Sequence, residues 1–163
     1  MKHIIIFDLD ETLIDSKHRN LRNSDGTVDL DHYRKFATKE NIFKDTLLPL
    51  AQEAKRLYAE GKHYIIFCTA RHMYDADYAY LKHHGLKANT ILSRDRASPK
   101  HYVMGDAMYK ATWLRPFRTL RQFAGKHMIM FDDERKVISA MRSNLGITCF
   151  NAISVNKRLA NEN

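Results

Sequence analysis

The sequence has few cysteines and lacks long apolar segments, internal repeats and low-complexity stretches. None of its apolar runs approaches the roughly 20 residues that a helix needs to span a bilayer, so no membrane partner is expected. The two cysteines, Cys68 and Cys149, both fall at the ends of strand-like runs, and we expect them to be buried, reduced thiols. The nine histidines show no metal-binding spacing, so zinc is not expected.

The length and composition are those of one globular domain. At 163 residues the chain can bury a single sizeable core, and 44% hydrophobic with 28% charged residues is an ordinary globular balance. The first apolar run meets an acid at Asp8, too early for the core of a signal peptide. We therefore expect one domain over residues 1–163 and a cytoplasmic location.

Positive charge exceeds negative charge and is unevenly distributed. The formal net charge is +8, and eight Lys or Arg against two Asp lie between residues 94 and 126. A basic surface can serve solubility alone, but it also suits a polyanionic partner such as a nucleic acid. A solvated helix face is the alternative for this segment.

Short apolar runs alternate with helical patterns along the chain. The patterns predict strands at 3–7, 63–68, 90–92, 127–131 and 147–150, and helices at 46–60, 74–84, from about 107 with a break at Pro116, and up to Gly146. Residues 14–45 look polar and irregular, and the tail from 156 looks frayed. Such alternation predicts an α/β fold, a parallel sheet flanked by helices.

Polar clusters follow three of the predicted strands. They are Asp8 with Asp10, Thr69-Ala70-Arg71, and Asp132-Asp133. Ligands of parallel α/β sheets bind beyond the carboxyl ends of the strands, where these clusters would meet. The sequence therefore predicts an active site at this edge.

Asp8 and Asp10 lie two residues apart, which places both side chains on one side of an extended chain. Such close carboxylates repel each other unless a cation lies between them or one takes a proton, and oxygen ligands favour magnesium. One carboxylate, Asp8, can then attack phosphorus and form an aspartyl-phosphate, while Asp10 acts as general acid and base. A solvated turn is the alternative for an isolated pair of this kind.

The second acidic pair, Asp132-Asp133, can supply further metal ligands, with Asp133 either a ligand or an orienting hydrogen-bond acceptor. A simple cap of the following helix is the alternative. Thr69 can donate its hydroxyl to a phosphoryl oxygen, assisted by backbone amides around Ala70, or it can merely fill space at a strand end.

Cations are needed beside a phosphate, and three residues are candidates. Arg71 offers a planar fork that suits phosphate oxygens. Lys110 lies four residues after Asp106 on one helix face, so a surface ion pair between the two is the alternative to a catalytic lysine. Lys100 competes for the same role.

These residues, in this order, resemble the haloacid dehalogenase superfamily of phosphatases. Its motifs correspond to Asp8, Asp10 and Thr12, then Thr69, then Lys110, then Asp132 with Asp133. The resemblance implies a phosphoaspartyl intermediate, Mg²⁺ held by Asp8, Asp10, Asp132 and Asp133, and a Rossmann-like five-stranded sheet. Its strands, numbered along the chain, would lie in the order 5-4-1-2-3.

Within that superfamily the chain is similar to the 3′-phosphatase domain of bacteriophage polynucleotide kinase/phosphatase. The likeness rests on Arg71 after Thr69, on Asp106 four residues before Lys110, and on a Met-Arg step at 141–142 before Gly146 and Cys149. It implies a phosphorylated DNA or RNA end as substrate, phosphate binding by Thr69, Ala70, Arg71 and Asp106, and host cytoplasm for a viral protein.

The chain also departs from that family. No glycine-rich triphosphate loop is present, so the kinase half is missing. Glu11 stands where a glycine is usual, and Arg19 or Arg22 is only a loose counterpart of the family's arginine after the first motif.

The insert before the second strand is too small for a large cap, and an open site suits large substrates. Tyr74, Tyr109 or Trp113 could stack on a terminal base, or they could pack in the core. Three hypotheses remain: a nucleic-acid end phosphatase, a phosphatase of nucleoside monophosphates or other small metabolites, and a non-catalytic domain that binds nucleic acid. A receiver domain is disfavoured, because its acidic pair belongs near the first strand.

Overall fold

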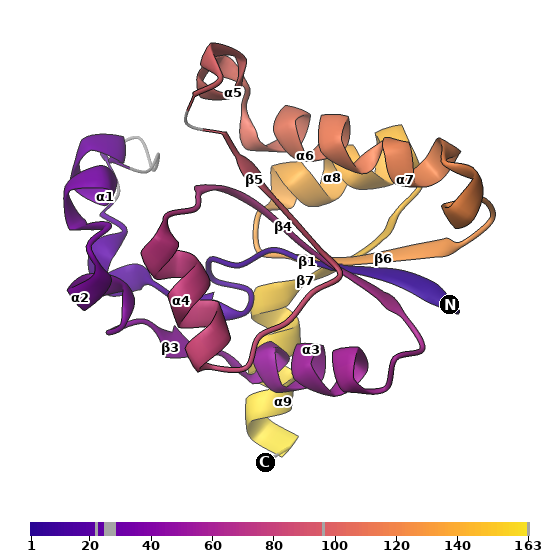
Figure 1. Cartoon of the computed structure of the whole chain (residues 1–163), viewed down its shortest axis with the longest axis horizontal. Helices are drawn as coiled ribbons and strands as arrows, with labels where there is room; N and C mark the ends of the chain where they lie inside the picture. The colour runs from indigo at the N-terminus through magenta and orange to yellow at the C-terminus, as the bar shows by residue number, and fades with distance from the viewer. Residues whose placement is uncertain (22, 25–28, 96, 163) are drawn as a thin grey trace.

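A computed structural model describes residues 1–21, 23–24, 29–95 and 97–162. Its centre is a five-stranded sheet in the order β5-β4-β1-β6-β7, with every neighbouring pair parallel (Figure 1). The strands are β1 His3–Phe7, β4 Tyr64–His72, β5 Thr90–Arg94, β6 His127–Asp132 and β7 Thr148–Asn151. The α/β class, the parallel sheet and the implied strand order are confirmed.

The central strand, β1, is apolar and buried from Ile4 to Phe7 because helices cover both faces of the sheet. Its successive side chains alternate between two core clusters: Ile4 and Ile6 pack on one face, Ile5 and Phe7 on the other. Phe7 is in register with both Phe67 of β4 and Phe131 of β6. The residues that follow each of these three positions therefore arrive together at the carboxyl edge of the sheet.

Helices form one layer on each side of the sheet (Figure 1). The first layer contains α6 Asp106–Leu114, α7 Pro116–Thr119 and α8 Arg135–Leu145. The second contains α3 Pro49–Ala59, α4 Asp75–His83 and α9 Ala152–Glu162. The predicted break at Pro116 is confirmed, and both Cys68 and Cys149 are buried free thiols as expected. No described helix is long and apolar enough to cross a membrane.

The segment expected to be irregular, 14–45, contains short regular elements. They are β2 Ile14–Asp15, η1 Lys17–Arg19, α1 Leu30–Phe36 and α2 Lys39–Ile42. The antiparallel partner of β2 is β3 Thr46–Leu47, so α3 begins at Pro49 and not at 46. We call residues 14–47 the insert. In Figure 1 its helices lie beside the carboxyl ends of β1 and β4.

Other boundaries also differ from the expected ones. The expectation of a frayed tail from residue 156 is wrong. The helix α9 continues to Glu162, because Asn156 anchors it in the core. The Asn156 side chain accepts a hydrogen bond from the Leu50 amide (2.8 Å) and donates one to the Thr12 carbonyl (2.9 Å). Two short elements were not expected, α5 Pro99–Val103 and η2 Arg121–Phe123.

Candidate active site

Three carboxylates meet at the carboxyl edge of the sheet. Asp8 follows β1, Asp132 ends β6 and Asp133 follows it, and one oxygen of each lies within 4.8 Å of the others. Asp8 is 6% exposed and Asp132 is fully buried. We call these three residues the acidic triad; the equal register of β1 and β6 brings them together.

Lys110 supplies the positive charge at this point. It extends from α6, and its Nζ lies 2.7 Å from Asp132 Oδ2 and 3.0 Å from Asp8 Oδ1. The alternative surface pair with Asp106 is not formed, because Asp106 is half exposed and pairs with Arg94 at 2.7 Å. Lys100, the competing candidate, is exposed on α5.

One ammonium does not balance the acidic triad. Burial raises the pKa of Asp8 well above its usual value, and the charges of Asp132 and Asp133 raise it further, although Lys110 opposes them. Burial, followed by the charge of Asp132, raises the pKa of Asp133 to about 6. Burial lowers the pKa of Lys110, but Asp8 and Asp132 outweigh this effect, so the ammonium form is strongly favoured.

Asp10 lies apart from the acidic triad because other side chains hold its carboxylate. Arg71 Nε donates to Asp10 Oδ2 at 3.0 Å, Arg71 Nη2 donates to Oδ1, and Ser16 Oγ donates to Oδ1 at 2.6 Å. Burial alone would raise the pKa of Asp10, but the charge and hydrogen bonds of Arg71 lower it to about 2. The structure therefore does not bring the Asp10 side chain into the expected set of metal ligands.

The remaining guanidinium nitrogen of Arg71, Nη1, also has a carboxylate partner. Its Nη1 donates to Asp77 Oδ1 at 2.6 Å, and Asp77 Oδ2 accepts from the Tyr74 amide at 2.9 Å, which caps α4. Arg71 is 6% exposed and Asp77 is 2% exposed. We call Asp10, Arg71 and Asp77 the arginine clamp. Arg71 was expected to bind phosphate, and in this arrangement it binds two carboxylates, using three of its five N–H groups.

Thr69 lies on β4, two residues before Arg71 of the arginine clamp. It is 1% exposed, and its Oγ1 accepts a hydrogen bond from the Arg71 amide at 3.1 Å. Within the described residues this hydroxyl donates no hydrogen bond, so its proton is available to an incoming oxygen. Ala70 lies between the two residues on β4, where a register shift against β5 interrupts the ladder between Cys68 and His72.

A second buried arginine was not assigned a role from sequence. Arg19, in the insert, is 1% exposed; its Nε and Nη2 donate to Asp45, and its guanidinium carbon lies 5.3 Å from the centre of the Tyr33 ring. Its charge contributes to the low pKa of Asp10. Asp45 lies 26 residues away, so no local spacing indicated the pair. The other candidate, Arg22, lies outside the described residues.

Glu11 occupies a backbone position that suits glycine. Its φ is 54°, in the left-handed region, which costs a non-glycine residue on the order of 1 kcal/mol. Nearby residues hold its side chain in place: Oε1 accepts a hydrogen bond from the Ser16 amide at 3.4 Å, and Oε2 forms an ion pair with Lys17 at 3.1 Å.

The aromatic residues considered for base stacking differ in exposure. Tyr109 is 1% exposed and packs against His101, so for this residue the core-packing alternative holds. Trp113 is 40% exposed on α6, and Tyr74 is partly buried at the start of α4. Stacking by these two residues remains a prediction.

The sequence is similar to known proteins over nearly its whole length. A family model described as bacteriophage T5 5′-deoxynucleotidase matches residues 1–162. The 5′-deoxynucleotidase of Escherichia phage T5 is 32% identical over 176 residues, which cover 98% of this chain and 71% of that protein.

Solved structures share the fold at lower sequence identity. A putative phosphatase from Clostridium difficile aligns with a TM-score of 0.65 at 15% identity, covering 92% of this chain and 84% of that one. A haloacid dehalogenase-like hydrolase from Streptococcus pneumoniae gives 0.64 at 13% identity, with coverages of 96% and 91%. A chain of the Pnkp1/Rnl/Hen1 complex gives 0.62 at 20% identity, and the match covers 93% of this chain but only 46% of that one. The fold is that of haloacid dehalogenase-type phosphatases.

Proposed function

Since the chain belongs to the bacteriophage T5 5′-deoxynucleotidase family and is a haloacid dehalogenase-type phosphatase, we propose that it hydrolyses 5′-deoxynucleoside monophosphates with the help of Mg²⁺. The observation that carries this proposal is the position of Lys110, whose ammonium bridges Asp8 and Asp132 beside Asp133. An ammonium and a carboxylate nucleophile held together in a buried site suit the attack of Asp8 on an anionic phosphoryl group.

The donor set fits magnesium. All three ligating groups of the acidic triad are carboxylate oxygens, with no imidazole or thiolate among them. Burial, and after it the neighbouring carboxylates, raises the pKa values of Asp8 and Asp133. We propose that the acidic triad holds the ion. When bound, Mg²⁺ would neutralise phosphoryl charge and help to orient the substrate.

The first chemical step belongs to Asp8. Its carboxylate attacks phosphorus, the bond from phosphorus to the 5′-oxygen breaks, and an aspartyl-phosphate forms with release of the deoxynucleoside. Lys110 keeps one Asp8 oxygen oriented and offsets the charge of the phosphoryl group. Thr69 can donate its free hydroxyl proton to a phosphoryl oxygen.

Asp10 has to serve twice, as acid for the leaving oxygen and as base for water. While Arg71 holds it, Asp10 is a carboxylate, which suits the second step: it accepts a proton from the water that attacks the aspartyl-phosphate. The first step requires a protonated Asp10. We propose that the substrate phosphate draws Arg71 away from Asp10, which removes the main cause of its low pKa.

The choice of a mononucleotide over a polynucleotide end rests on the relatives. The protein that shares 32% identity is a 5′-deoxynucleotidase, whereas the Pnkp1 complex shares only the fold at 20% identity. The 3′-end substrate, expected first from sequence, therefore becomes the competing outcome of the test.

The test measures phosphate release from 5′-deoxynucleoside monophosphates, their 3′ isomers, and oligonucleotides phosphorylated at the 3′ or the 5′ end. Each substrate is assayed with Mg²⁺ and with EDTA, at two salt concentrations. We expect the highest kcat/KM for the 5′ mononucleotides, no turnover in EDTA, and a weak dependence on salt. Preference for the 3′-phosphorylated oligonucleotide, with strong salt inhibition, would contradict the proposed substrate.

A further inference from the structure

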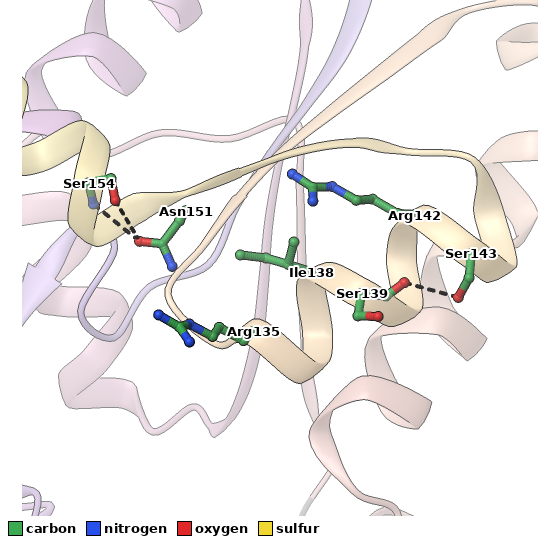
Figure 2. Close-up of a pocket in the computed structure, with 7 residues that line it drawn as sticks. All are labelled: Arg135, Ile138, Ser139, Arg142, Ser143, Asn151 and Ser154. Carbon is green, nitrogen blue, oxygen red and sulfur yellow. Dashed lines mark hydrogen bonds between the residues drawn. The ribbon is translucent and has the colours of Figure 1, made fainter.

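A polar groove outside the acidic triad runs along α8 beside the corner where β7 leads into α9. It has a volume of about 660 Å³, and no carboxylate lines it. Its lining, drawn in Figure 2, consists of Arg135, Ile138, Ser139, Arg142, Ser143, Asn151 and Ser154. We call it the basic groove. The proposed hydrolysis uses none of these residues.

The two arginines of the basic groove carry positive charge without a carboxylate partner. The Arg135 side chain is exposed and makes no hydrogen bond or ion pair within the described residues. Arg142 donates only to the Cys149 carbonyl, at 2.6 Å, which holds its guanidinium across the groove toward β7. The surrounding chain adds to the potential, because residues 135–162 contain five Lys or Arg and one Glu. An anion bound here would meet no repulsive neighbour in the lining.

Two arginines and a serine form a row along α8. Arg135 and Arg142 are seven residues apart on α8, which separates their backbones by about 10 Å along the helix axis. Ser139 lies between them on the same face, and its hydroxyl makes no side-chain hydrogen bond to the described residues. The row arginine, serine, arginine therefore offers donors to successive anionic groups of an extended ligand.

The floor and the far wall of the groove indicate how such a ligand would be recognised. Ile138 is the apolar member, and no aromatic side chain lines the groove, so bases would find no stacking partner. On the far wall, the Asn151 side-chain oxygen accepts hydrogen bonds from Ser154 (Figure 2). The Asn151 side-chain nitrogen donates to the Asp133 carbonyl at 3.4 Å. That contact places one end of the groove beside the acidic triad.

The geometry points to a binding site for the sugar–phosphate backbone of a polynucleotide strand in the basic groove. Binding is independent of sequence, because the donors reach phosphates and not base edges. Its function is to hold the phosphatase on a nucleic acid, with the active site adjacent, and it goes beyond hydrolysis of a mononucleotide. In the expected basic segment 94–126, Arg94, Lys110 and Arg118 are instead engaged by Asp106, the acidic triad and the carbonyls of Leu145 and Gly146.

The test is fluorescence anisotropy with a labelled 12-nucleotide single strand that has no terminal phosphomonoester, in EDTA, so that turnover does not enter. We expect the wild-type protein to bind with an affinity that falls as salt increases. Arg135→Glu should raise Kd about tenfold and reduce the slope of log Kd against log salt by roughly 0.7, the contribution of one phosphate contact. Ser139→Asp, which places a negative charge between the two arginines, should weaken binding to a similar extent.

Lys87→Glu is the matched control. It makes the same change in net charge at an exposed lysine that precedes β5, at the opposite edge of the sheet, and its Kd should change less than twofold. Equal weakening by Arg135→Glu and Lys87→Glu would overturn the proposal, because only net charge would then matter. It would also be overturned if 5′-deoxynucleoside monophosphate, added at the same phosphate concentration, displaced the strand as well as unlabelled strand does. Circular dichroism of each variant verifies that it is folded.

Discussion

The acidic triad and the arginine clamp lie side by side at one edge of the sheet, yet they differ in how their charges are balanced. Three carboxylates of the triad share one ammonium, and the pKa values of Asp8 and Asp133 are raised. In the clamp, Arg71 lies between two carboxylates, and the pKa of Asp10 is lowered to about 2. The triad lacks positive charge that a divalent cation can supply, whereas the clamp is internally paired. We infer that the triad binds the metal ion and supplies the nucleophile, and that the clamp controls the protonation of Asp10.

The largest effect should follow from changing the nucleophile in the triad. We expect Asp8→Asn to lower kcat by at least about 10⁴-fold, because an amide cannot form the acyl phosphate. The fold should be retained, since the change removes a carboxylate whose charge the buried site disfavours, and Lys110 keeps Asp132 as its partner. Phosphate release and thermal unfolding in EDTA measure the two effects.

The control for this variant is Asp75→Asn, the same chemical change at an exposed position in the first turn of α4. It should retain wild-type kcat. Turnover by Asp8→Asn at more than a small fraction of the control rate would remove Asp8 from the role of nucleophile.

A smaller loss is expected from the centre of the clamp. Arg71→Lys keeps the charge but loses the fork that contacts Asp10 through two nitrogens and Asp77 through a third. We expect kcat/KM to fall about 10²-fold, with part of the loss in KM, since lysine is a poor substitute at a bidentate site. Steady-state kinetics against pH provide the measurement. A variant with unchanged kcat/KM would show that the clamp has no part in the reaction.

Asp77 should act only through Arg71 and should therefore matter less. Asp77→Asn can still accept a hydrogen bond from the Tyr74 amide or from Arg71, but it removes the second negative charge of the clamp. We expect about a tenfold fall in kcat/KM, together with a shifted pH profile that a purely structural role would not produce. An unshifted profile with lower Tm would assign Asp77 to the cap of α4 alone.

The smallest expected effect concerns stability without metal. Folding raises the pKa of Asp133 from 3.8 to about 6, and it also raises the pKa of Asp8, so the folded protein binds these protons more tightly than the unfolded chain does. Raising the pH from about 4 to about 6 in EDTA should therefore lower Tm, by roughly a few degrees. Asp10 has no effect in this window, because its lowered pKa changes stability only as pH falls from 3.8 toward about 2. Differential scanning fluorimetry should show a smaller fall of Tm for Asp133→Asn than for the wild type. An equal fall in the two proteins would contradict the assignment of this effect to Asp133.

The acidic triad could be predicted from the sequence because its members lie at the carboxyl ends of two strands, and parallel strands end together. Lys110 and Thr69 could be placed by the same reasoning combined with the family resemblance. The arginine clamp could not be predicted by this reasoning. Asp77 belongs to the next helix, and its contact with Arg71 depends on where α4 begins relative to β4. The pairing of Arg19 with Asp45 depends on how the insert folds, which its polar sequence did not indicate.

The fold, too, has features that local sequence patterns predict and features that they do not. Periodic apolar runs indicated all five strands and their order followed from the resemblance, but α9 was missed because its end is rich in asparagine and charge. What holds this helix is one buried side chain, Asn156, whose two partners lie more than 100 residues away in sequence. Local patterns carry no information on such a contact.

The difference between the two groups can be measured directly by isothermal titration calorimetry of Mg²⁺ at pH 7 without substrate, in the wild-type protein, Asp132→Asn and Asp77→Asn. We predict that the wild-type protein and Asp77→Asn bind Mg²⁺ with similar affinity, and that Asp132→Asn binds at least about tenfold more weakly. If Asp132→Asn bound Mg²⁺ as tightly as the wild type, or if Asp77→Asn lost as much affinity, the acidic triad would not be the metal site.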